Sequence, residues 1–455
     1  MVYLNIIYFI IITVVALNFL FSNGKAVRSV LNNGTLLQYS NTEMLWWLTF
    51  STGLIALSAN VGLNLMAIRL FILEILCIAG IIMSRNRIVF SFPLWIYVAY
   101  LIWIIIGIFY SRYPIYGVRT TLKYLYPLLL CLFASTAVKD AEVFLKSSLW
   151  ARIIGVISII VAFIPFVESF IFPGVFWYGT ARAINFISIM IFSLGMVLFS
   201  NEKKKNIIFT ILFLLPCILW VFRTSIMGSA IALMAFALIR YKWKSIPIIA
   251  AVLVLGVVSV FYIPSIKEKM FYDDSVTIED LQEGKINEDN INTNYRAYMW
   301  EQMEKLFYDR HKMTGSGTGT SQGYMYEYPE DFGGLKILHS DFEQQKCDNG
   351  DIALYLYGAM ILLIFIDCFR TYWRVPYPLI RLCALVAGAS LIGVYATFYS
   401  DNVVNYSMAT LSMPFGFYGM MLGMRSKWRD NPDDPEYQEE TDDSLLEEEI
   451  MPESN

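Results

Sequence analysis

Residues 223–263 read RTSIMGSAIALMAFALIRYKWKSIPIIAAVLVLGVVSVFYI. Within this stretch, two apolar runs at 225–240 and 246–263 flank a short turn that is rich in basic residues. A membrane-spanning helix needs about 20 mostly apolar residues, and both runs approach that length. We therefore expect two membrane helices that are joined on the basic side of the membrane.

Comparable apolar runs recur along the chain, so we expect an all-α, polytopic membrane protein with about 12–14 transmembrane helices. Of the 455 residues, 57% are hydrophobic and 16% are charged, whereas a soluble protein carries about 25% charged residues. The run at 43–60 is interrupted by polar residues and could instead lie flat or re-enter. The expected spans are 3–22, 43–60, 65–83, 88–109, 116–138, 148–172, 183–200, 206–222, 225–240, 246–263, 351–369, 378–399 and 406–424.

Basic residues fall in every second loop between these spans, which fixes the expected orientation. Lysine and arginine mark cytoplasmic loops, so residues 264–350 form one large external loop, with 17 acidic and 9 basic residues. Membrane helices would occupy 1–263 and 351–424, and an acidic, disordered cytoplasmic tail 425–455. The basic clusters are Arg85/Arg87, Lys139/Lys146, Lys203/Lys204/Lys205, Arg240/Lys242/Lys244, Arg370/Arg374 and Arg425/Lys427/Arg429.

Several basic residues break this rule, because they lie at the outer ends of the spans. A charge in the hydrocarbon costs roughly 3 kcal/mol and usually faces the protein interior or a cavity. Each of these side chains could instead reach lipid headgroups or pair with Glu74 or Glu168. Together they favour a site for an anion with several oxygens, such as a lipid-linked phosphate or diphosphate. They are Arg69, Arg112, Arg119, Lys123, Arg182 and Arg223.

The external loop contains a helical pattern and a glycine run. Residues 294–309 have the spacing of an amphipathic helix with Arg296 and Trp300 on one face. We expect Trp300 to pack on the membrane domain, and Arg296 either to cap that packing or to point into a site. The run TGSGTGTSQG at 314–323 could bring backbone N–H groups to an anion, but a flexible connector is the favoured interpretation.

His339 is the candidate general base in this loop. An imidazole has an unperturbed pKa of about 6.5, so it can take a proton from a hydroxyl group at neutral pH. The alternative is an exposed loop histidine. Asp341 follows closely and is a candidate substrate-binding residue, whereas His311 has a solvated setting. Two distant histidines lack the spacing of metal ligands, so we expect no metal and no cofactor.

Four motifs follow one another in residues 220–365. They are Arg223-Thr-Ser before a membrane helix of small residues, Arg296 with Trp300, the glycines of 315–319, and His339-Ser-Asp-Phe followed by Asn349-Gly350. In order and spacing these motifs resemble the O-antigen ligase and O-antigen polymerase family of bacterial membrane glycosyltransferases. The chain departs from the family pattern at Ser340, where asparagine is common, and at 348–350, where the family pattern is more acidic.

The resemblance implies a GT-C-like enzyme of the bacterial inner membrane with an active site that faces the periplasm. It implies polyprenyl-diphosphate-linked glycans as donor and acceptor, and no nucleotide sugar, metal or nucleic acid. By position, Arg223 and Arg296 would grip the donor diphosphate, and His339 would activate the acceptor hydroxyl in a single, inverting displacement. Membrane lipid and a chain-length regulator protein are further candidate partners.

Alternative functions stay open. We favour a polymerase, which joins lipid-linked repeat units, over a ligase, which transfers the glycan to a lipid A-core acceptor. A transporter or flippase of lipid-linked glycans usually shows two related halves, and the sequence shows no internal repeat. A protein that only binds assembly partners would leave the outer-leaflet cations unexplained.

Overall fold

The structure, a computed structural model, is helical over nearly all of the residues that it describes. These are 27–32, 35–54, 57–58, 65–84, 87–139, 141–163, 176–177, 179–219, 222–273, 276–285, 290–292 and 295–432. Two short antiparallel strand pairs are the exceptions. They are β1 (Val27–Asn32) with β2 (Thr35–Ser40), and β3 (Leu57–Ser58) with β4 (Phe176–Trp177). The expected span at 3–22 and the tail beyond residue 432 lie outside the described residues.

The chain is an all-α, polytopic membrane protein, as its apolar runs predict. Every expected span from residue 43 onward overlaps a helix. The described residues contain five helices long and apolar enough to cross a membrane, by length and composition. The longer helices are α2 (Asn41–Leu54), α3 (Leu65–Ser84), α4 (Phe92–Tyr110), α5 (Pro114–Ala137), α6 (Ala141–Phe163), α8 (Gly179–Phe199), α9 (Lys203–Leu219), α10 (Arg223–Tyr241), α11 (Ile246–Tyr262), α16 (Asp341–Arg374), α17 (Pro378–Ala396) and α19 (Ser412–Asp430).

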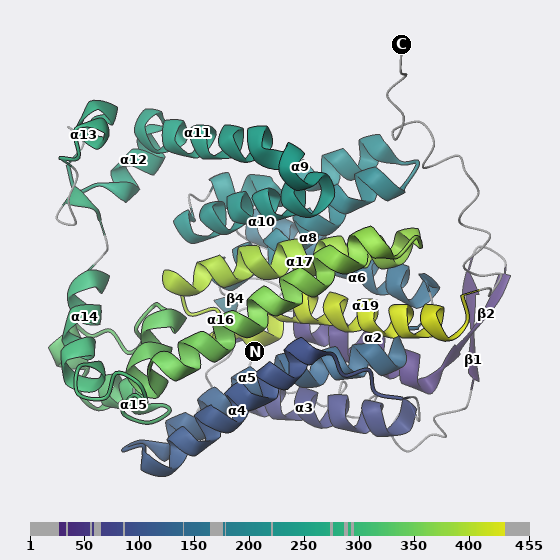
Figure 1. Cartoon of the computed structure of the whole chain (residues 1–455), viewed down its shortest axis with the longest axis horizontal. Coiled ribbons are helices and arrows are strands. Elements are labelled where there is room, and N and C mark those ends of the chain that lie inside the picture. The colour runs from purple at the N-terminus through teal and green to yellow at the C-terminus, as the bar shows by residue number, and fades with distance from the viewer. Residues whose placement is uncertain are drawn as a thin grey trace.

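Short helices of the large loop gather at one end of the molecule, and the β1–β2 hairpin lies at the other (Figure 1). Residues 299–347 form a small core of their own from Met299, Met303, Met325, Phe332, Leu338 and Cys347. This second part of the loop is therefore a packed unit. The elements of the whole loop are α12 (Pro264–Met270), α13 (Ile278–Gln282), α14 (Arg296–Met303), the π-turn η3 (Glu304–Tyr308), α15 (Thr320–Glu327) and the 3-10 turn η4 (Pro329–Phe332).

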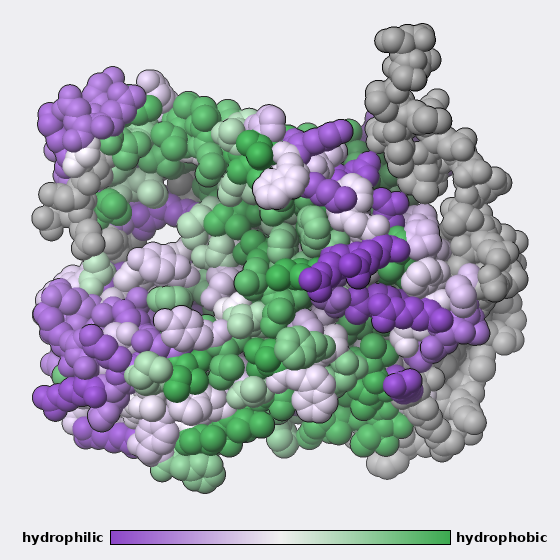
Figure 2. Space-filling view, viewed as in Figure 1, coloured by the Kyte–Doolittle hydropathy of each residue, from purple (hydrophilic) through white to green (hydrophobic). Residues whose placement is uncertain are grey.

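Helices α17 and α11 show the two environments of the membrane part. Helix α17 packs against α8, α10, α16 and α19, and 78% of the window from Pro378 to Tyr399 is buried. By contrast, α11 has no buried residue, and Leu253, Val254 and Leu255 are all more than half exposed. Figure 2 shows hydrophobic residues over the middle of one face and hydrophilic residues toward the two ends. An exposed apolar helix of this kind is suited to lipid.

The basic residues at the end of α10 lie far from the loop. Arg240 donates a hydrogen bond to the Tyr372 hydroxyl at 3.1 Å, and the Lys242 Nζ lies 3.6 Å from the ring centroid of Trp373. Both aromatic residues belong to the last turn of α16, whose first turn lies in the loop. The basic ends of α10 and α16 therefore share one end of the bundle. The predicted orientation requires this, because it places both basic clusters on the same side of the membrane. That this end faces the cytoplasm stays a prediction.

Candidate functional site

Arg223 ties the large loop to the membrane helices. It is the first residue of α10, and its Nη1 donates to the backbone carbonyl oxygens of Lys269 and Asn292, at 2.6 Å each. Lys269 belongs to the last turn of α12, and Asn292 lies between α13 and α14. One guanidinium group thus fixes two parts of the loop over the first turn of α10.

Arg296 lies beside Arg223. It opens α14, and its Nη1 donates to the Ser400 carbonyl oxygen at 2.6 Å. The Ser400 hydroxyl in turn contacts the Thr224 hydroxyl at 3.2 Å. The two guanidinium groups are close enough to repel each other electrostatically, and in the described part of the chain neither forms a salt bridge. Two adjacent cations without a paired carboxylate leave charge available for an anion.

His339 completes this group from the far end of the loop. It has a left-handed backbone, with φ of 51°, directly before Ser340, whose hydroxyl caps α16 by accepting the N–H of Glu343 at 3.1 Å. A positive φ is strained for a residue with a side chain, and such strain clusters at functional sites. We refer to Arg223, Arg296, His339 and the neighbouring Asp401 as the outer cluster.

Trp300 holds the segment that leads into His339. Its Nε1 donates to the Leu338 carbonyl oxygen at 2.7 Å, and its ring meets that of Tyr399 edge to face, with centroids 5.6 Å apart. Because Tyr399 lies in the short turn η5 (Thr397–Tyr399) after α17, the expected packing of Trp300 on the membrane domain is confirmed. The same indole thereby positions the candidate base.

Burial and positive charge decide the protonation state of His339. Burial lowers the pKa of its imidazole to about 4, and Arg296 acts in the same direction. The side chain is half-buried, not exposed, and it is neutral at pH 7. Burial raises the pKa of the Asp401 carboxyl. The hydrogen bond that it accepts from the backbone N–H of Asn402, and the nearby charge of Arg296, act against that rise. The outer cluster therefore combines two fixed cations with a neutral group that can accept a proton.

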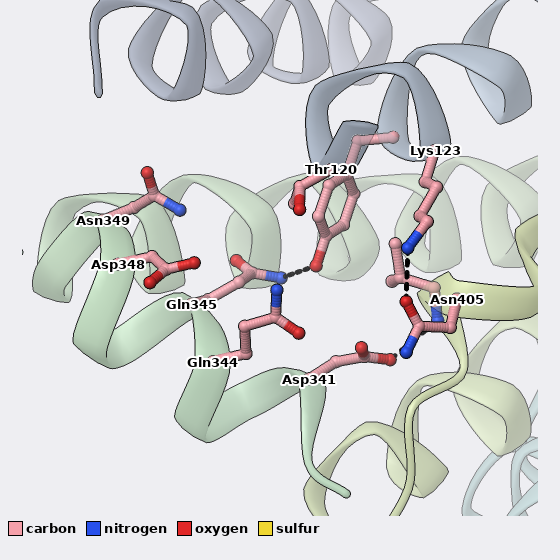
Figure 3. Close-up of a pocket in the computed structure, with 10 residues that line it drawn as sticks. Thr120, Lys123, Asp341, Gln344, Gln345, Asp348, Asn349 and Asn405 are labelled. Carbon is pink, nitrogen blue, oxygen red and sulfur yellow. Dashed lines mark hydrogen bonds between the residues drawn. The ribbon is translucent and has the colours of Figure 1, made fainter. Parts of the chain in front are cut away.

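A polar pocket lies beside the outer cluster, between α5 and the first turns of α16 (Figure 3). Lys123 of α5 donates to the side-chain oxygen of Asn405. Asp341 accepts the Val404 N–H at 2.8 Å, and its own N–H donates to the Asp401 carbonyl oxygen at 3.2 Å, which joins the pocket to the outer cluster. We refer to it as the amide pocket; its lining includes Thr120, Lys123, Tyr124, Asp341, Gln345 and Asn405.

The glycine run at 314–323 is neither a phosphate loop nor a flexible connector. Both carboxylate oxygens of Asp348 accept N–H groups from it, from Ser321 at 2.7 Å and from Gly319 at 2.9 Å. The Thr318 N–H donates to the Gly107 carbonyl oxygen of α4 at 3.2 Å. Because these donors are used within the protein, they are not free for an anion. The run instead fastens the loop to α4, α5 and α16.

Replacing Gly319 by alanine should destabilise the protein. Gly319 has φ of +85°, and a Cβ there would lie 2.2 Å from the Gly117 backbone nitrogen. We expect a loss of about 2–4 kcal/mol, measured by thermal unfolding in detergent. Gly334→Ala is the matched control, because Gly334 has φ of +83° but nothing within 4 Å, so strain alone should cost about 1 kcal/mol. Equal losses would contradict the close approach.

Residues 208–357 match the family model described as O-antigen ligase. This stretch is similar to the O-antigen ligase family. The match confirms the resemblance drawn from the motifs, and it supports a function of the O-antigen ligase or polymerase type. The matched stretch contains Arg223, Arg296 and His339, whereas α5 and the turn after α17 lie outside it. Comparison with curated proteins finds no match for the chain.

The other predicted cations occupy different places. Arg112 and Arg119 are exposed, and their guanidinium groups lie 5.5 Å and 5.3 Å from the ring centroids of Tyr113 and Tyr116. Arg69 is buried in α3, 3% exposed. The backbone of Arg182 lies in α8, but its side chain is outside the described residues. Of the basic residues predicted on α5, only Lys123 lines the amide pocket.

Sequence analysis missed the turn between α17 and α19. It reads SDNVVN at 400–405 and supplies the Ser400 carbonyl to Arg296, Asp401 to the outer cluster and Asn405 to the amide pocket. A signal was present, because a run with four polar side chains connects two apolar spans on the side that is expected to be external. Residues outside the matched stretch thus contribute to both the outer cluster and the amide pocket.

Proposed function

We propose that the chain is a glycosyltransferase of the polymerase type, which joins polyprenyl-diphosphate-linked repeat units on the periplasmic face of the bacterial inner membrane. The observation that carries the glycosyltransferase part of this proposal is the pair Arg223 and Arg296, held close together beside His339. Arginine forks bind phosphate oxygens in bidentate fashion. A diphosphate carried by a membrane lipid is an anion that could reach this place from the outer leaflet.

In the proposed reaction, an acceptor hydroxyl oxygen attacks the anomeric carbon of the donor sugar. The bond between that carbon and the diphosphate oxygen breaks, and the His339 imidazole takes the hydroxyl proton. The diphosphate leaves with the bonding electrons, and Arg223 and Arg296 stabilise its growing charge. Such preorganised donors are among the largest contributions to catalysis. Attack opposite the leaving group inverts the anomeric centre.

A ligase is the second candidate, because the matched family model is described as O-antigen ligase. The two functions share the donor side of the reaction and differ in the acceptor. A polymerase extends another lipid-linked repeat unit, whereas a ligase requires a lipid A-core molecule. The outer cluster, which would hold the donor, fits both functions equally.

A reconstitution experiment separates these functions. The purified protein in liposomes is given only the lipid-diphosphate repeat unit, and the products are resolved by size. We expect a ladder of lengthened glycans from this single substrate. A product that forms only after lipid A-core is added would establish the ligase instead. Movement of an unaltered lipid between the two leaflets would establish a transporter.

A further inference from the structure

The amide pocket contains two buried polar atoms without a partner. The Thr120 hydroxyl and the Gln345 side-chain oxygen make no hydrogen bond within the described residues, although these residues are only 4% and 3% exposed. Buried polar atoms in folded proteins nearly always have a partner. Thr120 comes from α5 and Gln345 from α16, and both line the same pocket. Their unused hydrogen-bonding capacity therefore points to a ligand that enters between the two helices.

The lining suits hydroxyl groups better than an anion. Lys123 is already hydrogen-bonded to Asn405 and lies near the carboxyl of Asp341. In Figure 3 the amide and carboxyl side chains of α16 project toward α5. Amide, carboxyl and hydroxyl groups together offer both donors and acceptors, which a sugar hydroxyl can match. This differs from the outer cluster, where two guanidinium groups lie side by side.

The size and position of the pocket narrow the ligand further. Its volume is about 10 Å³, which is room for one water-sized group, so it can take a single hydroxyl group of a sugar rather than a whole ring. Asp341 lines it only two residues after His339 and bonds to the Asp401 backbone of the outer cluster. A sugar whose edge occupies the pocket would therefore lie next to the candidate base.

We infer that the amide pocket binds the hydroxyl edge of the acceptor sugar and presents a neighbouring hydroxyl to His339. The inference rests on the proposed glycosyltransferase function. It assigns Thr120 and Gln345 as specificity-determining residues for the acceptor. It also assigns Asp341 to the acceptor, and it moves Lys123 from the donor diphosphate to the acceptor. The donor diphosphate then binds at the two guanidinium groups of the outer cluster. The acceptor binds in the adjoining amide pocket, which is lined by amide, carboxyl and hydroxyl groups.

Thr120→Val removes the unpartnered hydroxyl and keeps the shape of the side chain. The probe is an alkyl glycoside of the repeat unit, released from its lipid, and its Kd for the purified protein is measured by calorimetry. We expect Thr120→Val to raise this Kd by about tenfold, because a polar ligand group would lose its partner. The KM for the same acceptor should rise equally, while the KM for the lipid-diphosphate donor should not change.

Thr121→Val is the matched control. Thr121 is the next residue on α5, it is also buried with an unpartnered hydroxyl, and it is not part of the pocket lining. The Kd of the Thr121→Val protein for the glycoside should stay within about twofold of that of the unaltered protein. The Thr120→Ser protein, which keeps a hydroxyl, should bind the glycoside as the unaltered protein does. Equal effects of the two valine variants, or no binding of the glycoside to the unaltered protein, would overturn the inference. Normal glycoside binding without glycan transfer would instead count against the proposed function alone.

Discussion

Replacing Arg296 by alanine is expected to lower the rate of glycan transfer by about 10²–10³-fold. The guanidinium group lies beside that of Arg223 and lacks a salt bridge in the described part of the chain, so it can stabilise the leaving diphosphate. Its loss should act on the transition state more than on acceptor binding. The measurement is the initial rate of donor consumption by the purified protein.

Two further variants separate catalysis from folding. Arg296 also donates to the Ser400 carbonyl oxygen, so Arg296→Ala could loosen the contact between the loop and the turn after α17. Arg296→Lys keeps the charge but loses the bidentate fork, and it should recover only part of the rate. Arg310→Ala removes an exposed arginine of the same loop and should leave the rate unchanged. Full activity of a stably folded Arg296→Ala protein would rule out the donor-binding role.

Hydropathy predicts the spans well but not their surroundings. Runs 246–263 and 378–399 look alike in sequence, and both become helices. Yet α11 has no buried residue, whereas α17 is mostly buried among other helices. Lipid and protein interior are both apolar, so an apolar run cannot show which of the two it will face. The sequence therefore predicts that a helix spans, and packing decides where it lies.

The site was predicted only in part, for physical reasons that differ between residues. Arg223, Arg296 and His339 lie within recognisable motifs, and the structure brings all three together. Lys123 was expected at the diphosphate, but it lies near Asp341 in the amide pocket, which depends on how α5 meets α16. The glycine run was misread because glycine permits both a mobile loop and close backbone packing. These two possibilities are distinguished only by the hydrogen-bond acceptors that surround the glycine run in the fold, such as the carboxylate of Asp348.

Replacing His339 by alanine is expected to lower turnover by about 10²–10⁴-fold, the usual contribution of a positioned general base. Donor affinity should change little, because Arg223 and Arg296 remain in place. The measurement compares kcat with the Kd for the donor. His311→Ala is the matched control, since His311 is the other histidine of the chain and is exposed in the loop. Unchanged turnover in His339→Ala would remove the imidazole from the reaction.

The pH dependence tests the same role without a mutation. Burial and Arg296 hold the pKa of free His339 at about 4, below its ordinary value of 6.5, so kcat/KM should stay level as pH falls to about 5 and then decline. A bound diphosphate brings negative charge next to the imidazole, which favours the protonated form and raises its pKa. The acid limb of kcat should therefore lie at higher pH than that of kcat/KM. If the acid limbs of kcat and kcat/KM coincide, the donor diphosphate does not bind beside His339. No other step of the proposed reaction would make the two limbs differ.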